Sequence, residues 1–412
     1  MMRRSLVLLS AGLILFPFKQ SFAAKASGLQ SPDLQYKKSF ISQRKQPVIR
    51  VRVRKKLKNV LVSGMDLKRK IHLNDSSKLF KGKKAIKFNC DGFGAKNRGK
   101  MESPVLLASL KSQTGLVTLG KEKYQGELLV VANHESPACD VINQVPIENY
   151  ISSLLSKEMN SSWSLEALKA QAVAARTYAL HKMKSNQVSK IEGHNVHYHI
   201  ESSEKHQVAG SFFDATRRTE LASRSTQGEV LIGPDKVLRP IFFHASCGGR
   251  TLKPDQVWEN HVDGYEAVDC RYCMTSPKRR WDNSVSYERM VNFLQWAGKK
   301  DLLGKKLVYT PGEEIRVAPD KLENDVSRIY VGEELYLIEK SDFRRYFGRV
   351  LFPSNHFKLS LSKKKGLTIH GSGNGHGVGL CQVGAYDLAR KGKTYKEILA
   401  HYFPNHKLKK MY

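Results

Sequence analysis

The segment from Val145 to Lys184 constrains the fold of this chain more than any other part of the sequence. It contains two runs of helical character, separated by a short polar break that carries Glu158. The second run opens at Ser164, a residue type that caps helices, and continues to Met183 without glycine or proline. Its apolar residues recur at spacings of three and four, and its many alanines let neighbouring backbone approach closely. We therefore expect a central helix, with Glu158 held still by rigid elements on both sides.

Residues 48–140 have the pattern of β-structure. The run from Val48 to Arg54 alternates apolar and basic residues with period two, as a half-buried strand does. Further strand-like runs are expected at Ala85–Phe88, Leu116–Leu119, Glu127–Ala132 and Val230–Ser246. Helical patterns begin only near Ile147. The expected fold class is therefore α+β, with mostly antiparallel strands and a central Ala-rich helical segment.

A chain of 412 residues is long enough for two or three domains. Composition divides it into a signal peptide at 1–23, a flexible basic leader at 24–47, a β-rich region at 48–140 and a larger region at 141–412. Helical and strand-like pieces at about 287–342 read as an insertion in the last region. Near the end of the chain, helices are expected at roughly Ala385–Arg390 and near Lys396–Tyr402.

The N-terminus has the features of an export signal. Arg3 and Arg4 precede a mostly apolar run, Leu6–Phe16, and Ser21-Phe22-Ala23 offers a cleavage site for signal peptidase. The apolar run is shorter than the ~20 residues that a spanning helix needs. An uncleaved N-terminal anchor is the alternative. Either way the sequence predicts an exported protein of the periplasm or cell envelope.

The chain is strongly basic, with a formal net charge of +31. Such a charge attracts polyanions, and nucleic acid is one class of candidate partner. Export argues against nucleic acid, because the anionic partners outside the membrane are the cell wall, lipid headgroups and surface polysaccharides. The basic residues form short clusters, such as Lys81–Lys84 and Lys363–Lys365, and no single basic helix. A polyanion groove and a generally solvated basic surface both remain open.

A glycine-rich run occupies residues 371–379. It lacks the G-x-G-x-x-G spacing, and no Lys-Ser or Lys-Thr follows it, so neither dinucleotide binding nor a P-loop is indicated. The glycines indicate unusual backbone dihedrals or a close approach to a ligand, with His376 and Gln382 presented beside them. A lone histidine is more often structural than catalytic.

Six cysteines, at positions 90, 139, 247, 270, 273 and 381, offer two kinds of chemistry. Cys270 and Cys273 form a C-x-x-C pair, and His244 with Cys247 lies upstream. Thiolates and imidazole suit tetrahedral zinc, so these four residues are candidate ligands of a structural zinc ion. In an oxidising compartment, a disulfide from Cys247 to Cys270 or Cys273 competes with that interpretation.

Taken alone, Glu158 fits two interpretations: an acid/base catalyst, or an ordinary glutamate at a helix end facing water. No catalytic Ser-His-Asp order can be singled out, and the chain contains no H-E-x-x-H motif.

Several blocks of the sequence resemble the SpoIID/LytB family of peptidoglycan-cleaving enzymes and amidase enhancers. The blocks occur in the family's order, and the resemblance extends over nearly the whole chain after the signal segment. They are VPIENYISSLLSKEM and LEALKAQAVAARTYAL at 145–180, FFHASCGGRT followed by VW at 242–258, and GHGVGLCQVGA with GKTYKEILAHYFP at 375–404. The early strand VIRVRV and the segment KYQGEL at 123–128 also fit.

The resemblance implies a lytic transglycosylase that acts on peptidoglycan glycan strands without stem peptides and needs no cofactor. Glu158 matches the family's catalytic glutamate, and Met159 and Trp163 are candidates for desolvating it. Candidate substrate-binding residues are Gln171, Arg176, Tyr178, Ser246, His376 and Gln382. The alternative that the family offers is a non-catalytic, wall-binding enhancer of a separate cell-wall amidase.

Four departures from the family pattern bear on these expectations. Asn160 replaces the usual proline after Glu-Met, which predicts a looser turn beside Glu158. The Cys-x-x-x-His-Cys segment of zinc-binding members reads ESSEKHQ at 201–207, so those ligands are largely lost. Ala245 and Cys247 replace two serines of the His-Ser-Thr-Ser-Gly-Gly block, and Cys381 stands where serine is common.

Overall fold

A computed structural model describes most of the chain from residue 46 onward. The described residues are 46–90, 104–133, 136–185, 190–191, 194–195, 197–202, 214–258, 261–271, 273, 280–303, 307, 312–320 and 325–412. The expected signal peptide and nearly all of the expected leader lie outside them. Among the described residues, no helix combines the length and apolar character needed to cross a membrane.

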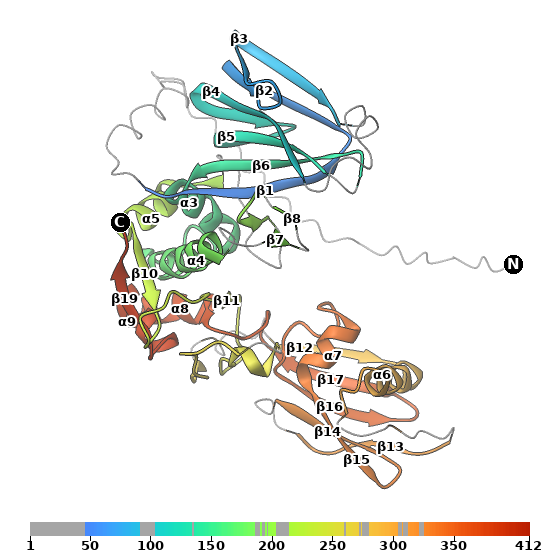
Figure 1. The fold of residues 1–412 in the computed structure, drawn as a ribbon. Coiled ribbons are helices and arrows are strands. Elements are labelled where there is room, and N and C mark those ends of the chain that lie inside the picture. The colour runs from blue at the N-terminus through green and yellow to red at the C-terminus, as the bar shows by residue number, and fades with distance from the viewer. Residues whose placement is uncertain are drawn as a thin grey trace, which may run out of the picture. The chain divides into compact units, whose positions relative to one another are not determined.

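The first half of the fold is a seven-stranded sheet with the order β3-β2-β4-β5-β6-β1-β9 (Figure 1). Its strands are β1 (Val48–Leu57), β2 (Asn59–Ile71), β3 (Ser76–Asn89), β4 (Val105–Leu119), β5 (Glu122–Ala132), β6 (Cys139–Pro146) and β9 (Ile200–Glu201). All neighbours are antiparallel except β1 and β9. A disulfide joins Cys90 to Cys139. The strand-like runs expected within 48–140 are confirmed, and the strands extend further than those runs.

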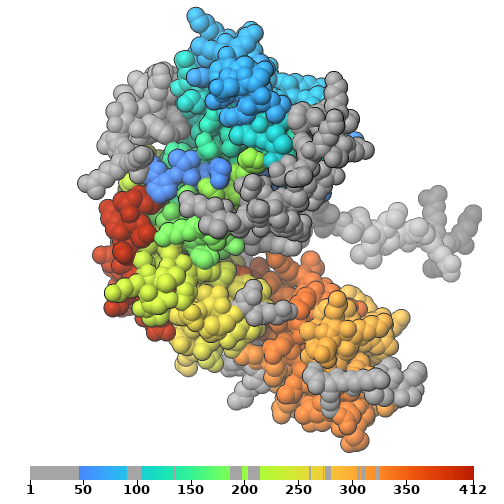
Figure 2. Space-filling model, viewed as in Figure 1, coloured from blue at the N-terminus to red at the C-terminus, as the bar shows by residue number. Residues whose placement is uncertain are grey.

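Strand β1 shows why the sequence alternates here. Ile49, Val51 and Val53 are buried in the core of the sheet, and the arginines between them face outward. Arg52 forms ion pairs with Asp140 and Glu201 at 2.9 and 2.8 Å. At the other edge, β3 is exposed along most of its length and carries the Lys81–Lys84 cluster on the surface seen in blue in Figure 2. Charged residues on an edge strand oppose pairing with another chain.

Three helices follow the sheet: α3 (Ile147–Glu158), α4 (Leu165–Ser185) and α5 (Arg217–Ser225). Helix α4 confirms the expected central helix, but it is buried on all sides and not along one apolar face. Its alanines at 167, 170, 172, 174, 175 and 179 are fully buried. It packs against α3, α5, β10 (Glu229–Ile232), α8 (Gln382–Arg390) and α9 (Tyr395–Tyr402). Alanine suits such a position because its small side chain lets several elements approach the same helix.

Short strand pairs connect this helical layer to the end of the chain. Strand β10 pairs with β19 (Lys407–Lys410), and β11 (Phe243–His244) pairs in parallel with β18 (Leu380–Cys381). The expected strand over Val230–Ser246 is thus two short strands with irregular chain between them. The remaining short elements are the hairpin β7 (Lys190–Ile191) and β8 (His194–Asn195) and the 3₁₀ helix η2 (Pro254–Gln256). Helices α8 and α9 confirm those expected near the end.

A second hydrophobic core lies between Val285 and Ile369, beyond the interval 287–342 expected for an insertion. Its aromatic centre comprises Phe293, Phe343, Phe347, Phe352 and Phe357. It is enclosed by β12 (Arg280–Val285), α6 (Tyr287–Lys299), β13 (Ile315–Val317), β14 (Val326–Val331), β15 (Glu334–Glu339), α7 (Lys340–Phe347), β16 (Phe357–Ser362) and β17 (Gly366–Ser372). Strands β12 and β17 are antiparallel neighbours, so the chain enters and leaves this region side by side.

Candidate active site

Glu158 is the last residue of α3, where the helix gives way to the turn that leads into α4. The N–H of Met159 still bonds to the Leu155 carbonyl at 2.9 Å. The side-chain oxygen of Asn160 then accepts hydrogen bonds from the N–H and the hydroxyl of Ser162, at 2.9 and 2.8 Å. Asn160 thus closes the turn with its own side chain, which opposes the loosening expected from the loss of proline.

Helix α5 fastens the same turn from outside. The guanidinium of Arg218 donates to the carbonyls of Ser161 and Trp163, at 3.1 and 2.7 Å. The Trp163 ring stacks on Tyr386 with 4.7 Å between centroids. Met159 is buried in the core. Neither Met159 nor Trp163 lines the cavity beside Glu158.

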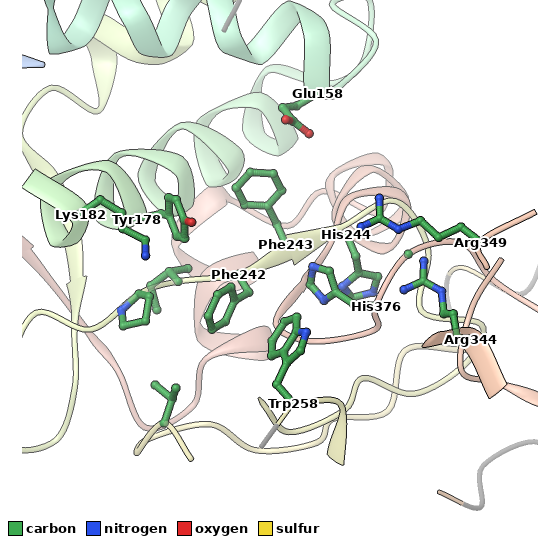
Figure 3. Close-up of a pocket in the computed structure, with 14 residues that line it drawn as sticks. Glu158, Tyr178, Lys182, Phe242, Phe243, His244, Trp258, Arg344, Arg349 and His376 are labelled. Carbon is green, nitrogen blue, oxygen red and sulfur yellow. The ribbon is translucent and has the colours of Figure 1, made fainter. Parts of the chain in front are cut away.

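Glu158 lines a cavity of about 710 Å³ (Figure 3). The cavity has an aromatic and aliphatic wall, comprising Ile241, Phe242, Phe243 and Trp258. Two imidazoles, His244 and His376, lie beside that wall. Three cationic side chains, Lys182, Arg344 and Arg349, also line it, together with Tyr178. Glu158 is the only acid among the described lining residues.

The glycine-rich run brings His376 next to His244. Gly373, Gly375, Gly377 and Gly379 all have positive φ angles, which glycine adopts without strain. A Cβ on Gly375 would lie 2.8 Å from the Cβ of His244, so only glycine fits this close approach. As a result the two imidazole rings lie 5.5 Å apart, centroid to centroid.

Both histidines are neutral at neutral pH. Burial lowers the pKa of His244 to about 4. Burial, with the neighbouring His244, holds the pKa of His376 well below its usual range. The Nδ1–H of His244 donates to the Val378 carbonyl at 3.0 Å, which leaves Nε2 as an acceptor without a partner among the described residues. Nδ1 of His376 accepts from the Val378 N–H at 3.1 Å, so its proton lies on Nε2.

Tyr178 projects into the cavity from α4 (Figure 3), and burial raises its pKa to about 12. Burial also raises the pKa of Tyr150, and the negative charge of Glu158 adds to that shift. Tyr178 is therefore a neutral hydroxyl donor at physiological pH. Of the predicted substrate-binding residues, the structure places Tyr178 and His376 in the cavity with Glu158.

Comparison with known proteins places these features in a family. Residues 135–232 match the family model described as SpoIID, stage II sporulation protein. An uncharacterized protein of Brachyspira hyodysenteriae is 32% identical over 286 residues, which cover 69% of this chain and 72% of that protein. Stage II sporulation protein D of Bacillus subtilis is 27% identical over 72% of this chain and 85% of its own length.

The chain belongs to the SpoIID/LytB family. The amidase enhancer of Bacillus subtilis is a further relative, 25% identical over 62% of this chain and 39% of its own length. The stretch 203–207, where zinc-binding SpoIID members carry ligands, lies outside the described residues.

Arg176 does not line the cavity, which corrects its expected role in substrate binding. Its side chain is fully buried and forms an ion pair with Glu148, 2.7 Å from Nη2 to Oε2. Arg176 also donates to the carbonyls of Ser223 and Glu229, at 3.0 and 3.1 Å. Burial alone would raise the pKa of Glu148, but the charge of Arg176 and several hydrogen bonds hold it below its usual value. This pair joins α3, α4 and α5.

Three other predicted substrate-binding residues are buried and do not line the cavity beside Glu158: Gln171, Ser246 and Gln382. Ser246 bridges to Asn374 through its backbone, which fastens the glycine-rich run to the segment after β11. Gln382 is the first residue of α8. Gln171 lies within the packed surface of α4, because the elements around that helix leave no exposed face.

The structure groups the candidate metal ligands differently from the sequence prediction. The thiols of Cys247, Cys270, Cys273 and Cys381 gather within 4.8 Å of one another. His244 is not a member, because its ring is turned toward Val378 and the cavity. The alternative, a disulfide from Cys247 to Cys270 or Cys273, is not formed in the structure, where all four residues are thiols. Sequence reasoning noted Cys381 only as a replacement for serine.

The sequence motifs did not predict the aromatic wall of the cavity or the cationic side chains that line it. Phe242 and Phe243 directly precede His244, so the motif itself pointed to them. Trp258 belongs to the Val-Trp pair that follows the same block. Arg344 and Arg349 come from the region with the second core, where no motif marks them.

Proposed function

We propose that this protein is an exported lytic transglycosylase that cleaves the bond between N-acetylmuramic acid and N-acetylglucosamine in peptidoglycan. The observation that carries the proposal is the single carboxylate, Glu158, in a cavity whose other described lining residues are aromatic, aliphatic, neutral or cationic. Ordinary retaining and inverting glycosidases need two carboxylates, whereas formation of a 1,6-anhydro ring needs one.

One glutamate suffices because the substrate supplies its own nucleophile. Protonated Glu158 donates its proton to the glycosidic oxygen as the bond to the anomeric carbon breaks. The resulting carboxylate takes the proton from the 6-hydroxyl of the same N-acetylmuramic acid, and that oxygen bonds to the anomeric carbon. The products are a shortened strand and a 1,6-anhydro end. Glu158 is protonated again, and no water is consumed.

The neutral side chains are suited to hold sugar hydroxyls. Nε2 of His244 is an acceptor without a partner among the described residues, so this ring can accept from a sugar hydroxyl, whereas a backbone hydrogen bond to Phe243 engages His376. The Trp258 ring lies 4.9 Å from Phe242 and 5.0 Å from His376, centroid to centroid. Such an aromatic wall packs against the apolar faces of sugar rings.

The cations support a preference for strands without stem peptides. Removal of the peptide leaves a free carboxylate on the lactyl group of N-acetylmuramic acid. Lys182, Arg344 and Arg349 line the cavity and carry the charge that such a group would attract. The guanidinium of Arg344 is held in place by the carbonyls of Phe352 and Pro353, at 3.0 and 3.3 Å. Arginine binds a carboxylate best when it is preorganised in this way.

The net charge of +31 supports attachment to an anionic wall after export. The exposed lysines of β3 present part of this charge on an edge strand of the sheet, and no residue of β3 lines the cavity. Nucleic acid is not the partner we propose, because the expected export signal directs the protein to the periplasm or cell envelope.

The deciding experiment compares purified wild-type protein with Glu158→Gln on peptide-free glycan strands. Mass spectrometry should detect 1,6-anhydro ends, lighter by one water than hydrolysed ends, from the wild type and not from the variant. Glu288→Gln is a matched control, because Glu288 is an exposed residue of α6 outside the cavity. The proposal is lost if the wild type releases no anhydro product or if Glu158→Gln releases as much as the wild type.

One relative bears the name amidase enhancer, which supports a second candidate function. In that case the protein binds the wall and stimulates a separate N-acetylmuramoyl-L-alanine amidase without cutting glycan itself. Adding the wild type and Glu158→Gln to such an amidase separates the two functions. Equal stimulation by both proteins, with no anhydro product from either, would favour the enhancer.

A further inference from the structure

We infer that Cys247, Cys270, Cys273 and Cys381 form a tetrathiolate site for one structural zinc ion. The four residues come from three separate parts of the chain. Cys247 follows β11, Cys270 and Cys273 form a turn, and Cys381 ends β18 and caps α8. All four are almost completely buried, between 0% and 1% exposed.

The spacing of the sulfurs suits a single ion. Their mutual distances all lie within 4.8 Å. Zinc–sulfur bonds of about 2.3 Å in a tetrahedron place the sulfurs about 3.8 Å apart, so small movements of the side chains complete the geometry. An iron–sulfur cluster has a larger body and would spread the sulfurs further. Four sulfurs fill the tetrahedron, which indicates a structural ion with no open position for substrate.

Hydrogen-bond donors lie next to the sulfurs and would stabilise them as thiolates. Sγ of Cys381 lies 3.4 Å from the N–H of Cys247 and 3.3 Å from that of Gly384, and both donate to it. The Tyr402 hydroxyl lies 3.1 Å from Sγ of Cys270. Outer hydrogen bonds of this kind orient metal ligands and stabilise their charge. A Cβ on Gly384 would come within 2.5 Å of Sγ of Cys270, so glycine keeps the space for the cluster.

The alternative use of these thiols is disulfide formation. Sγ of Cys247 and Sγ of Cys273 lie 3.2 Å apart, and no bond joins them. In the same chain Cys90 and Cys139 are bonded at 2.03 Å. A disulfide uses two thiols, whereas the buried arrangement brings all four to one point. That convergence favours the metal.

The ion would hold the two histidine-bearing segments of the cavity together. His244 lies three residues before Cys247, and His376 lies five residues before Cys381. The backbone bridge between Ser246 and Asn374 already joins the same segments. A metal at this point therefore fixes the wall opposite Glu158 without taking part in the reaction.

The first test measures metal content in the full-length protein, purified without chelators. Elemental analysis should find one zinc per chain. Cys381→Ser should lose most of it, and the double variant Cys90→Ser, Cys139→Ser should keep it, because those two residues are outside the cluster. Since a cluster variant may fail to fold, wild-type protein is also exchanged with Co²⁺, where tetrahedral thiolate ligands give intense sulfur-to-cobalt absorption.

Three results would overturn the proposal. The first is an intact mass lower by two hydrogens for a pair within the four cysteines. The second is freshly purified protein with four alkylatable thiols, little zinc and no cobalt spectrum. The third is iron at full occupancy in place of zinc. Each is measured without glycan cleavage, so the outcome is independent of the proposed transglycosylase activity.

Discussion

The side-chain oxygen of Asn160 accepts a hydrogen bond from the backbone N–H of Ser162, at 2.9 Å. This contact closes the turn two residues after Glu158, at the position where other members of the family carry proline. Proline restricts the backbone through its ring, whereas Asn160 restricts it through a side-chain hydrogen bond. Arg218 holds the outer side of the same turn. The orientation of the Glu158 side chain therefore depends on several polar contacts in this turn.

We expect Asn160→Gly to lower kcat severalfold with little change in KM. The variant loses hydrogen bonds of about 1 kcal/mol each and gains backbone freedom. Asn160→Pro should keep near wild-type turnover, because Met159 has the extended backbone (φ −135°, ψ 154°) that precedes proline readily. Steady-state kinetics on peptide-free strands checks both. Wild-type kcat in Asn160→Gly would show that the turn does not position Glu158.

Arg349 is expected to bind the acidic group of the substrate. Arg349→Gln should raise KM about tenfold on peptide-free strands, since a charge-assisted hydrogen bond contributes roughly 1.5–3 kcal/mol and exposure weakens it. The effect should shrink in high salt. Arg345→Gln is the matched control, because Arg345 is exposed, pairs with Asp342 at 3.5 Å and lies outside the cavity. Equal KM values for the two variants would show that Arg349 does not contact the carboxylate of the substrate.

The buried pair of Arg176 and Glu148 makes a prediction about stability. Arg176→Met should lower the free energy of unfolding by roughly 3–5 kcal/mol, because it leaves a buried carboxylate without its cation. Arg54→Met, which breaks an exposed pair with Glu122, should cost less than about 1 kcal/mol. Urea denaturation compares them. If both variants lost a similar free energy of unfolding, the buried pair would not be what stabilises the packing of α3, α4 and α5.

Buried histidines predict that stability falls in mild acid. Burial lowers the pKa of His406 to about 4, and neither ring nitrogen has a partner among the described residues. The unfolded chain, with a pKa near the ordinary 6.5, binds the proton first, so this stabilisation is present above pH 6.5 and is lost as pH falls toward 4.

His406→Phe should therefore make the dependence of the urea midpoint on pH shallower between pH 6.5 and 4. An unaltered slope in His406→Phe would show that folding does not lower the pKa of His406. His199 and His244, whose pKa values burial also lowers to about 4, would then account for any acid sensitivity.

The sequence was most informative where a pattern is local. The alternation in Val48–Arg54, the alanines of α4 and the polar break at Glu158 each depend on neighbours a few residues away. Glycines at 373–379 indicated a close backbone approach, and the structure supplies its partner, the segment with His244.

What the sequence did not reveal depends on contacts between distant segments. Arg176 was predicted to bind substrate, but its side chain is buried against Glu148 on the preceding helix. Cys381 joins a cluster with Cys247, 134 positions earlier. Arg349 reaches the cavity from a region that no motif marks. Spacing along the chain carries no information about such meetings, because they are set by how helices and strands pack.

The pairing of β12 with β17 has a consequence for how this protein could diversify. The stretch between these strands has its own core and is attached through one pair of adjacent strands, yet it contributes arginines to the cavity. Replacing this region would therefore change the cationic side chains of the cavity and leave Glu158 and its turn unaltered. Under the proposed activity, we expect such a replacement to change which glycans are bound and to keep the catalytic carboxylate.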